Sequence, residues 1–204
     1  MQDLALHRPL ERLQEVVKSI HSKWWSTEAL QEVSIFNSNV QKHGANNLNL
    51  FVVLTTCFLN LGGSLASDDL YLLDLRNGDA AAQWMIVPVV GRTPSRRYGH
   101  TIVFSKPYLL VFGGNTGTEP VNDVWCLNVD KAPFTWENLR VTSADKPAVR
   151  AYHASALCTT GSASGMMVTF GGRTADQSAL KDTWGLRRHR DGRWDWVQAP
   201  YKNG

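Results

Sequence analysis

Two segments of the chain carry arginine and histidine at the same spacing after a proline. They are Pro94-Ser95-Arg96-Arg97-Tyr98-Gly99-His100 and Pro147-Ala148-Val149-Arg150-Ala151-Tyr152-His153. A guanidinium group offers a planar fork of donors that suits a carboxylate or a phosphate. The repeated histidines could ligate a metal, but a residue used once in each repeat favours a structural role. We therefore predict that each imidazole hydrogen bonds to the backbone near a glycine turn.

Three Gly-Gly pairs show which elements position these residues. Each pair ends an apolar run and is followed by an acidic-apolar-aromatic step and then by a tryptophan. The pairs are Gly62-Gly63, Gly113-Gly114 and Gly171-Gly172, and the steps are Asp69-Leu70-Tyr71, Asp123-Val124-Trp125 and Asp182-Thr183-Trp184. The pairs are 51 and 58 residues apart. A period of about 50 residues is typical of propellers built from one four-stranded blade per repeat.

One blade can be predicted strand by strand. The expected strands are His100–Phe104, Tyr108–Phe112, Val121–Asn128 and Thr135–Val141. The first two flank a proline-bearing turn, as in a β-hairpin. The aspartates of the repeated steps suit hydrogen bonding at a turn or at the start of a strand. The tryptophans suit the space between neighbouring blades, where each indole N–H needs a partner.

The predicted fold is all-β: a partial propeller of about three four-stranded blades over residues 48–204, preceded by a helical extension and linker over residues 1–47. Apolar residues between Leu10 and Trp24 recur at helical spacing. This extension could cover a blade edge, bind a partner or result from a wrongly joined gene. Propellers close with about four to eight blades. Three blades leave open edges, so we expect the chain to need further blades or self-association.

Composition narrows the classes of function. The net charge of +3 is too small to indicate a nucleic-acid partner. Cys57, Cys126 and Cys158 lack metal-site spacing, and no cofactor or metal is predicted. The apolar stretch Leu48–Leu61 is too short to cross a bilayer. With no signal peptide at the start, a cytoplasmic or nuclear location is expected. The basic segment 187–193 is either a solvated hairpin tip or a phosphate-binding patch.

The repeats resemble kelch repeats. Residues 58–204 are also similar to the kelch region of the protein phosphatases with kelch-like repeats. The motifs that carry this second resemblance are Asp68-Asp69-Leu70-Tyr71-Leu72-Leu73-Asp74, Arg97-Tyr98-Gly99-His100, Phe134-Thr135-Trp136 and His189-Arg190-Asp191-Gly192-Arg193-Trp194-Asp195-Trp196. The last motif is the most specific of them.

In that family the propeller precedes a metal-dependent Ser/Thr phosphatase domain. Its metal-binding Gly-Asp-x-His-Gly, Gly-Asp-x-Val-Asp-Arg-Gly and Gly-Asn-His-Glu motifs do not occur in this sequence. We therefore expect no catalytic residues and no catalysis by this chain. The resemblance implies a non-catalytic protein–protein interaction module that regulates or targets a phosphatase. The alternative is a stand-alone kelch adaptor whose N-terminal helix recruits a second partner.

The resemblance also implies where a partner binds. In kelch propellers with peptide partners, the arginine at the start of the innermost strand commonly lines the ligand face. That position corresponds to Arg97 and Arg150, which would suit an acidic or phosphorylated protein segment. The alternative is that each arginine pairs with an aspartate of a neighbouring blade or with backbone carbonyl groups.

Overall fold

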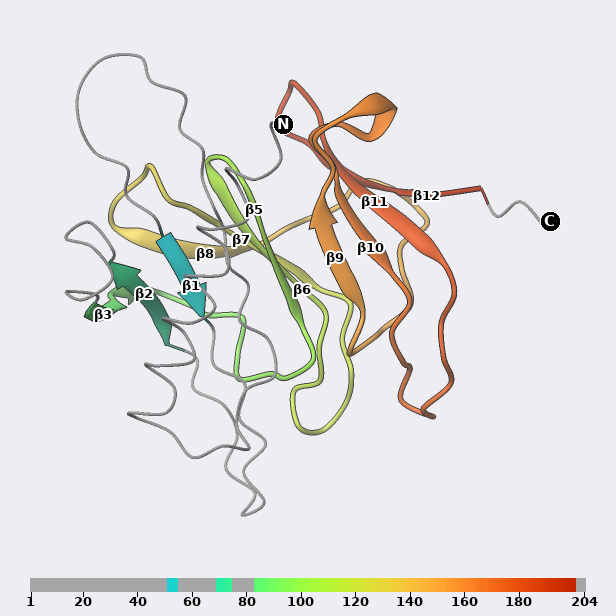
Figure 1. Ribbon diagram of the computed structural model, residues 1–204, viewed down its shortest axis with the longest axis horizontal. Coiled ribbons are helices and arrows are strands. Elements are labelled where there is room, and N and C mark those ends of the chain that lie inside the picture. Colours follow the sequence, from blue (N-terminus) through green and yellow to red (C-terminus); the bar gives the residue numbers. More distant parts are fainter. Residues whose placement is uncertain (1–50, 55–68, 75–82, 201–204) are drawn as a thin grey trace, which may run out of the picture.

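The computed structural model describes residues 51–54, 69–74 and 83–200, and the side chains of residues 69–70 and 85–200. The strands of this part form three sheets that stand side by side like blades (Figure 1). The first blade contains β1 (Phe51–Leu54), β2 (Leu70–Asp74) and β3 (Gln83–Val87). None of the described helices is long and apolar enough to cross a membrane.

The second blade confirms the strands predicted for one repeat. It contains β5 (Thr101–Ser105), β6 (Tyr108–Phe112), β7 (Val124–Asn128) and β8 (Phe134–Asn138), each antiparallel to the next. Strand β7 begins three residues later than predicted because the backbone of Val121 pairs with loop residues and not with β6. Its N–H donates to the Gly114 carbonyl over 2.8 Å, and its carbonyl accepts from the Arg150 N–H over 3.1 Å.

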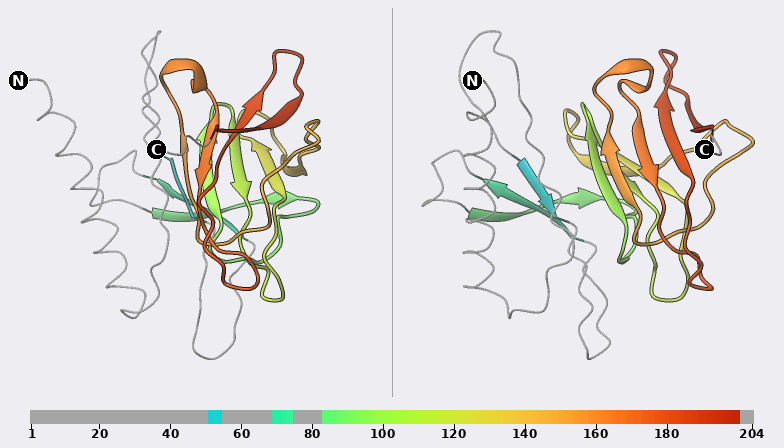
Figure 2. Two further views of the ribbon diagram at one scale, coloured as in Figure 1. Left: turned by 90° about the vertical axis from the view of Figure 1, so that its right-hand side faces the viewer. Right: turned by 45° about the vertical axis from the view of Figure 1, so that its right-hand side comes forward.

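The third blade repeats this order with a longer first turn. Its strands are β9 (Ala154–Leu157), β10 (Met167–Phe170), β11 (Thr183–Arg188) and β12 (Trp194–Gln198). The turn between β9 and β10 contains the short 3₁₀ helix η2 (Gly161–Ala163). Strand β9 lies beside β5, so the two inner strands are neighbours (Figure 2).

The segments that link the blades add a contact that the sequence did not predict. Strand β4 (Val89–Val90) follows the first blade and runs parallel to β8, the outer strand of the second. Likewise Val141, which was predicted to end β8, forms a parallel bridge with Trp194 in the third blade. Each linker thus pairs in parallel with the outer strand of the blade that it leads into.

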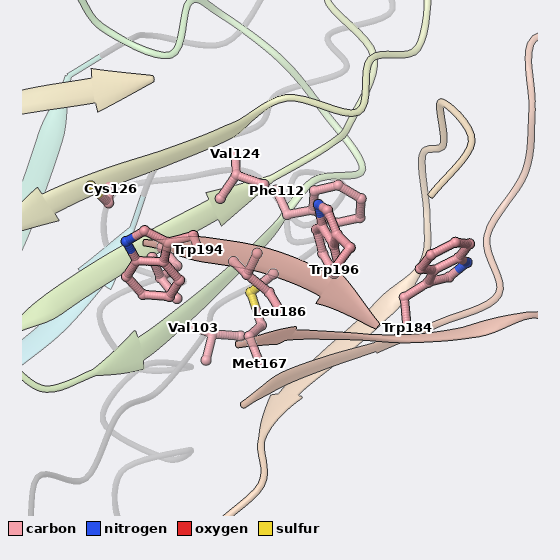
Figure 3. Close-up of a cluster of buried hydrophobic side chains, with 10 residues drawn as sticks. Val103, Phe112, Val124, Cys126, Met167, Trp184, Leu186, Trp194 and Trp196 are labelled. Atoms are coloured by element: carbon pink, nitrogen blue, oxygen red, sulfur yellow. The ribbon is translucent and has the colours of Figure 1, made fainter. Parts of the chain in front are cut away.

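Two apolar cores lie between the blades because residues along each strand face alternate sides. The core between the second and third blades contains Val103, Leu110, Phe112, Val124, Cys126, Met167, Trp184, Leu186, Trp194 and Trp196 (Figure 3). The core between the first and second contains Leu70, Ile102, Leu109, Val111, Leu127 and Trp136. Burying such a side chain contributes about 1.5–3 kcal/mol. The predicted role of the tryptophans as filling between blades is confirmed for Trp136, Trp194 and Trp196.

The two glycines of a pair allow two different close approaches. A Cβ atom on Gly113 would lie 2.9 Å from the Arg150 carbonyl oxygen and 2.9 Å from Cε1 of His153, both in the segment that begins the third blade. A Cβ atom on Gly114 would lie 2.7 Å from Cβ of His100 in its own blade. Both glycines have positive φ, at 62° and 91°. The pair therefore sets the spacing within and between blades.

The all-β class and the propeller-type blades are thus confirmed. The predicted helices within residues 1–47 and the apolar run before Gly62-Gly63 lie outside the described residues, and the division at residue 48 stays a prediction. In the first blade the strand that pairs with β2 is Phe51–Leu54.

Replacing Gly114 with alanine tests the packing role of the glycine pair. We expect Gly114→Ala to lower the free energy of unfolding by roughly 2–4 kcal/mol, because the new methyl group meets both strain and a clash. Gly192 is the matched control, since its φ is 89° but no atom of the described residues beyond its chain neighbours lies within 4 Å of its Cβ position. Gly192→Ala should lose only about 1 kcal/mol in urea unfolding. Equal losses would show that the contact with His100 is unimportant.

Candidate protein-binding face

Four loop segments meet at one end of the second and third blades. They are residues 91–99 and 142–153, which lead into the inner strands, and residues 113–123 and 171–182, which join the second strand of each blade to the third. Backbone pairs tie them together: Tyr98 with Asn115, and Ala151 with Arg173. We call this end the loop face. It carries most of the residues that the sequence analysis singled out.

Arg97 lies beneath the loop face in a network within the second blade. Its Nη1 donates to Oδ1 of Asp123 over 2.7 Å, and its Nη2 donates to Oδ2 over 3.1 Å. The guanidinium also donates to the carbonyl groups of Gly113 and Pro94. Asp123 Oδ2 accepts a further bond from Nε1 of Trp125, over 2.6 Å. The arginine thus joins the start of the inner strand to the Gly-Gly turn and to the start of β7.

Arg150 makes the corresponding contacts with an aspartate and with the Gly-Gly turn of the third blade. Both Nη atoms donate to the Asp182 carboxylate over 2.8 Å, and Nη1 also donates to the Gly171 carbonyl. Nε1 of Trp184 donates to Asp182 over 2.7 Å. Hydrogen bonding from Arg150 lowers the pKa of Asp182, although partial burial opposes the shift. We call each of these two networks an Arg–Asp–Trp clasp.

The clasps bury the side chains of both arginines. The Arg97 and Arg150 side chains are 3% and 0% exposed. In the structure each arginine pairs with an aspartate and with carbonyl groups, and these partners belong to the arginine's own blade. Their predicted role as partner-binding residues stays a prediction. The signal that could have found the pairing is the Asp-x-aromatic step, which recurs once after each of the two arginines.

The repeated histidines are buried and close the gap between the inner strands. Nε2 of His153 lies 2.9 Å from Oγ1 of Thr101, which also donates to Ser155 over 2.7 Å. Nε2 of His153 thus meets a side chain of the preceding blade, and the backbone of Phe112, directly before the Gly-Gly turn, also acts on the imidazole. The predicted backbone hydrogen bond near the glycine turn stays a prediction. Burial and Arg150 lower the pKa of His153 to about 3, and burial and Arg97 lower that of His100 to about 4. Within the described part of the chain, no three metal-ligating side chains cluster.

Two tyrosines on the loop face were missed by the sequence analysis. Tyr152 is 46% exposed, and its ring lies 6.0 Å from that of Tyr98 in the preceding repeat. Tyr152 has a φ of 58°, which is a left-handed conformation. Its counterpart in the preceding repeat is Gly99, which adopts the same conformation with a φ of 62°. The signal was present in the sequence, because Tyr152 and Gly99 occupy the same place before the repeated histidine.

Basic side chains outnumber acidic ones on the loop face. The exposed cations are Arg92, Arg96, Lys146, Arg173 and Lys181, and the exposed carboxylates are Glu119, Asp145 and Asp176. The remaining charges there belong to the clasps. This balance gives the face a weak positive potential.

The basic segment 187–193 lies at the opposite end and forms the predicted hairpin tip. Arg187 pairs with Asp195, and Arg193 pairs with Asp191. Arg188 stacks over the Tyr108 ring at 4.7 Å. These internal pairs favour the solvated turn over a phosphate-binding patch.

The two described cysteines, Cys126 and Cys158, are free thiols. Cys126 lies in the core between the second and third blades. Burial, with the nearby Glu137, raises the pKa of its thiol to about 12. A thiol in this state is unreactive and packs as a small apolar side chain.

The blades and the loop face define a repeat scaffold of the propeller type. A family model described as the KLHDC2/KLHL20/DRC7 Kelch-repeats domain matches residues 50–203. The chain therefore belongs to the kelch-repeat family, and the predicted resemblance is confirmed. Kelch repeats form protein–protein interaction modules, which is the class of function that this membership gives the chain.

Several longer proteins share this region. The chain is 36% identical over 137 residues to the serine/threonine-protein phosphatase BSL2 of Arabidopsis thaliana, a match that covers 67% of this chain and 13% of the phosphatase. It is 36% identical over 113 residues to an F-box/kelch-repeat protein of the same plant, covering 53% and 23%. It is 33% identical over 94 residues to Host cell factor 1 of Homo sapiens, covering 43% and 4%. The matches thus span less than a quarter of each relative.

The buried histidines predict a loss of stability in mild acid. Above pH 6.5 both are neutral whether the chain is folded or unfolded, so their contribution is fully present. As the pH falls from 6.5 towards 4, His100 and His153 become protonated in the unfolded chain but stay neutral in the folded chain. The free energy of unfolding therefore falls. Each unit of pKa difference is worth about 1.4 kcal/mol. Urea unfolding at several pH values measures this slope.

Two variants identify the source of the slope. His153→Gln should flatten the dependence between pH 6.5 and 4.5, because it removes one of the two groups. Gln198→Asn is the control, since this exposed residue of β12 has no titratable group and the change should leave the slope unchanged. A stability that does not change between pH 7 and 5 would contradict the buried, neutral state of the histidines.

Proposed function

We propose that the chain binds a segment of a protein on its loop face and thereby targets a Ser/Thr protein phosphatase. The observation that carries the binding site is the exposed Tyr152 ring, which is held against Tyr98 at the junction of two repeats. Tyrosine supplies a large, rigid contact area with a polar tip, and it is enriched in the centres of protein interfaces. The two rings give the loop face an aromatic centre surrounded by polar loops.

The backbone of Tyr152 supports a role in binding. A non-glycine residue in the left-handed region costs about 1 kcal/mol or more, and such strain is concentrated at functional sites. The rest of the structure holds it there: the Tyr152 N–H donates to the Gly99 carbonyl over 2.7 Å. A Cβ atom on Gly99 would lie 3.1 Å from the Tyr152 ring. The glycine of one repeat thus leaves room for the tyrosine of the next.

The surplus of exposed cations on the loop face favours an acidic or phosphorylated segment as the partner. Arg97 and Arg150 contribute by holding the loops that carry Tyr98 and Tyr152. Each arginine is adjacent, or nearly so, to one of these tyrosines in the sequence. Contact of the guanidinium groups with the partner would require the buried pairs with Asp123 and Asp182 to open. Losing one partner of a buried ion pair costs about 3–5 kcal/mol.

The link to a phosphatase rests on the similarity to the kelch region of BSL2. The module itself is proposed to be non-catalytic, so the phosphatase activity would belong to another part of a longer protein. The alternative is a stand-alone kelch adaptor, to which the similarity with the F-box/kelch-repeat protein lends support. A cytoplasmic or nuclear location belongs to either proposal.

Replacing Tyr152 with glycine separates binding from stability. The preceding repeat already has a glycine, Gly99, at the equivalent position, and glycine adopts a positive φ without strain. We expect Tyr152→Gly to leave the melting temperature unchanged or higher, and to abolish binding to peptides selected from an array of acidic and phosphorylated sequences. Fluorescence anisotropy with the selected peptides measures the loss.

The matched control is Arg190→Ala, an exposed cation at the opposite end of the blades, which should change neither property. A selected phosphopeptide should also be dephosphorylated faster by BSL2 than its scrambled version is. Unchanged binding by Tyr152→Gly would contradict the proposed site. Equal rates for the selected and scrambled peptides would contradict the targeting role and leave the binding site intact.

A further inference from the structure

A serine on the loop face has features that the third repeat does not copy. Ser95 is exposed and follows a buried proline, and Ala148 takes the same place after Pro147. The φ of Ser95 is 61°, whereas Ala148 does not have a positive φ. A non-glycine residue in this region is strained, and such strain is concentrated at functional sites. The third repeat builds its blade without this hydroxyl and this strain, so neither is needed for the fold.

The Ser95 hydroxyl lies beside the clasp of the second blade. Its Oγ is 3.5 Å from Nη2 of Arg97 and donates to the Pro94 carbonyl over 2.5 Å. Nη2 also donates to Oδ2 of Asp123 over 3.1 Å, while Nη1 donates to Oδ1 over a shorter 2.7 Å. An anionic group added to Oγ therefore meets a guanidinium that can keep its aspartate through Nη1.

Basic residues stand on both sides of Ser95 in the sequence. Arg92 comes three residues before it, and Arg96 and Arg97 follow it directly. Arg92 and Arg96 are exposed, and residues 91–97 belong to no strand or helix. Protein kinases select substrates by their charge pattern, and a basophilic kinase reads basic residues around the serine. A segment outside strands and helices opens locally at low cost, which gives a kinase access to it.

We propose that Ser95 is a phosphorylation site for a basophilic protein kinase and that Arg97 holds the resulting phosphate. The γ-phosphoryl group of ATP is transferred to Ser95 Oγ. The Oγ–H bond breaks, an Oγ–P bond forms, ADP leaves, and the proton passes to the catalytic base of the kinase. Phosphoserine carries a charge of about −1.5 to −2 at pH 7 and three acceptor oxygens. Guanidinium groups bind such oxygens by strong, charge-assisted hydrogen bonds.

Ser143 is a comparison within the same chain. It is the only other serine or threonine of the sequence with an arginine, Arg140, three residues before it. Its Oγ accepts a hydrogen bond from the Trp196 N–H over 2.9 Å. Two residues after Ser143 stands Asp145, where an arginine follows Ser95. A kinase that reads basic residues on both sides should therefore choose Ser95.

The phosphate would also change the charge of the loop face. The five exposed cations and three exposed carboxylates of this face leave a surplus of two positive charges. A phosphate on Ser95 offsets most or all of that surplus, three residues before Tyr98. Phosphorylation should then weaken binding of an acidic segment by roughly tenfold. This consequence rests on the proposed function, whereas the phosphorylation itself does not.

Kinase treatment of the full chain tests the site. A basophilic kinase with ATP should place the phosphate on Ser95, as located by mass spectrometry. Arg92→Gln should slow the incorporation about tenfold or more, whereas Arg140→Gln should leave it unchanged. Ser95→Ala, which copies the residue of the third repeat, should abolish it. Phosphate mainly on another residue, or equal rates for the two arginine variants, would overturn the proposal.

Phosphorus NMR of the phosphorylated chain tests the contact with Arg97. The guanidinium should hold the pKa of the folded phosphoserine below its value in the chain unfolded by urea, because a nearby cation favours the dianion. The phosphate then adds stability above the unfolded pKa, and this stability is lost as the pH falls through the folded pKa. The phosphorylated chain should melt several degrees higher than the unmodified chain at pH 7.5, with a smaller difference at pH 5. Equal pKa values in the folded and unfolded chains, or a lower melting temperature at pH 7.5, would contradict the contact.

Peptide binding tests the consequence separately. Fluorescence anisotropy with a selected acidic peptide compares the phosphorylated chain with the unmodified chain and with Ser95→Ala. Phosphorylation should weaken binding about tenfold, and Ser95→Ala should bind like the unmodified chain before and after kinase treatment. If Tyr152→Gly abolishes binding but phosphorylation does not weaken it, the effect on the loop face is wrong and the proposed function stands. If Tyr152→Gly leaves binding unchanged, the proposed function fails, and the kinase and NMR results still decide whether Ser95 is a phosphate site.

Discussion

Each described kelch repeat with an Arg-x-x-His segment depends on one buried ion pair. Arg97 with Asp123, and Arg150 with Asp182, connect three parts of a blade that are distant in sequence: the start of the inner strand, the Gly-Gly turn and the start of the third strand. A buried guanidinium needs its charge and its donors satisfied, so these three parts can adopt only one mutual arrangement. The indole N–H of the next aromatic residue shares the same carboxylate.

The close packing around this pair explains why the blades stack as they do. The glycines let the Arg150 carbonyl and the His153 ring approach the preceding blade, and the neutral histidine fills the gap beside Thr101. Arg150 and His153 are both buried in this packing. The repeated polar residues therefore hold the scaffold together, and the proposed function assigns recognition to loop residues that differ between repeats, of which Tyr152 is the clearest example.

The sequence predicted the strands well because alternation, turns and the glycine pairs are local signals. All four strands of the second blade were found, with end shifts at Val121 and Val141 where residues pair outside their own ladder. The partners of the Arg97 and Arg150 side chains could not be derived from local signals in the same way. A guanidinium suits a partner's carboxylate as well as an internal one, and only the fold brings Asp123 and Asp182 within reach. The tyrosine pair was missed because its two members belong to different repeats and meet only when the blades stack.

The measurement that tests this account most directly is a double-mutant cycle on Arg150 and Asp182, followed by urea unfolding at pH 7.5. The account predicts that Arg150→Met and Asp182→Asn each lower the free energy of unfolding by about 3–5 kcal/mol, since each leaves a buried partner unsatisfied. The double variant should then lose clearly less than the sum of the two. The exposed pair of Arg193 and Asp191 serves as the control and should show no measurable coupling. Additive losses at Arg150 and Asp182 would contradict the claim that this pair holds the blade together.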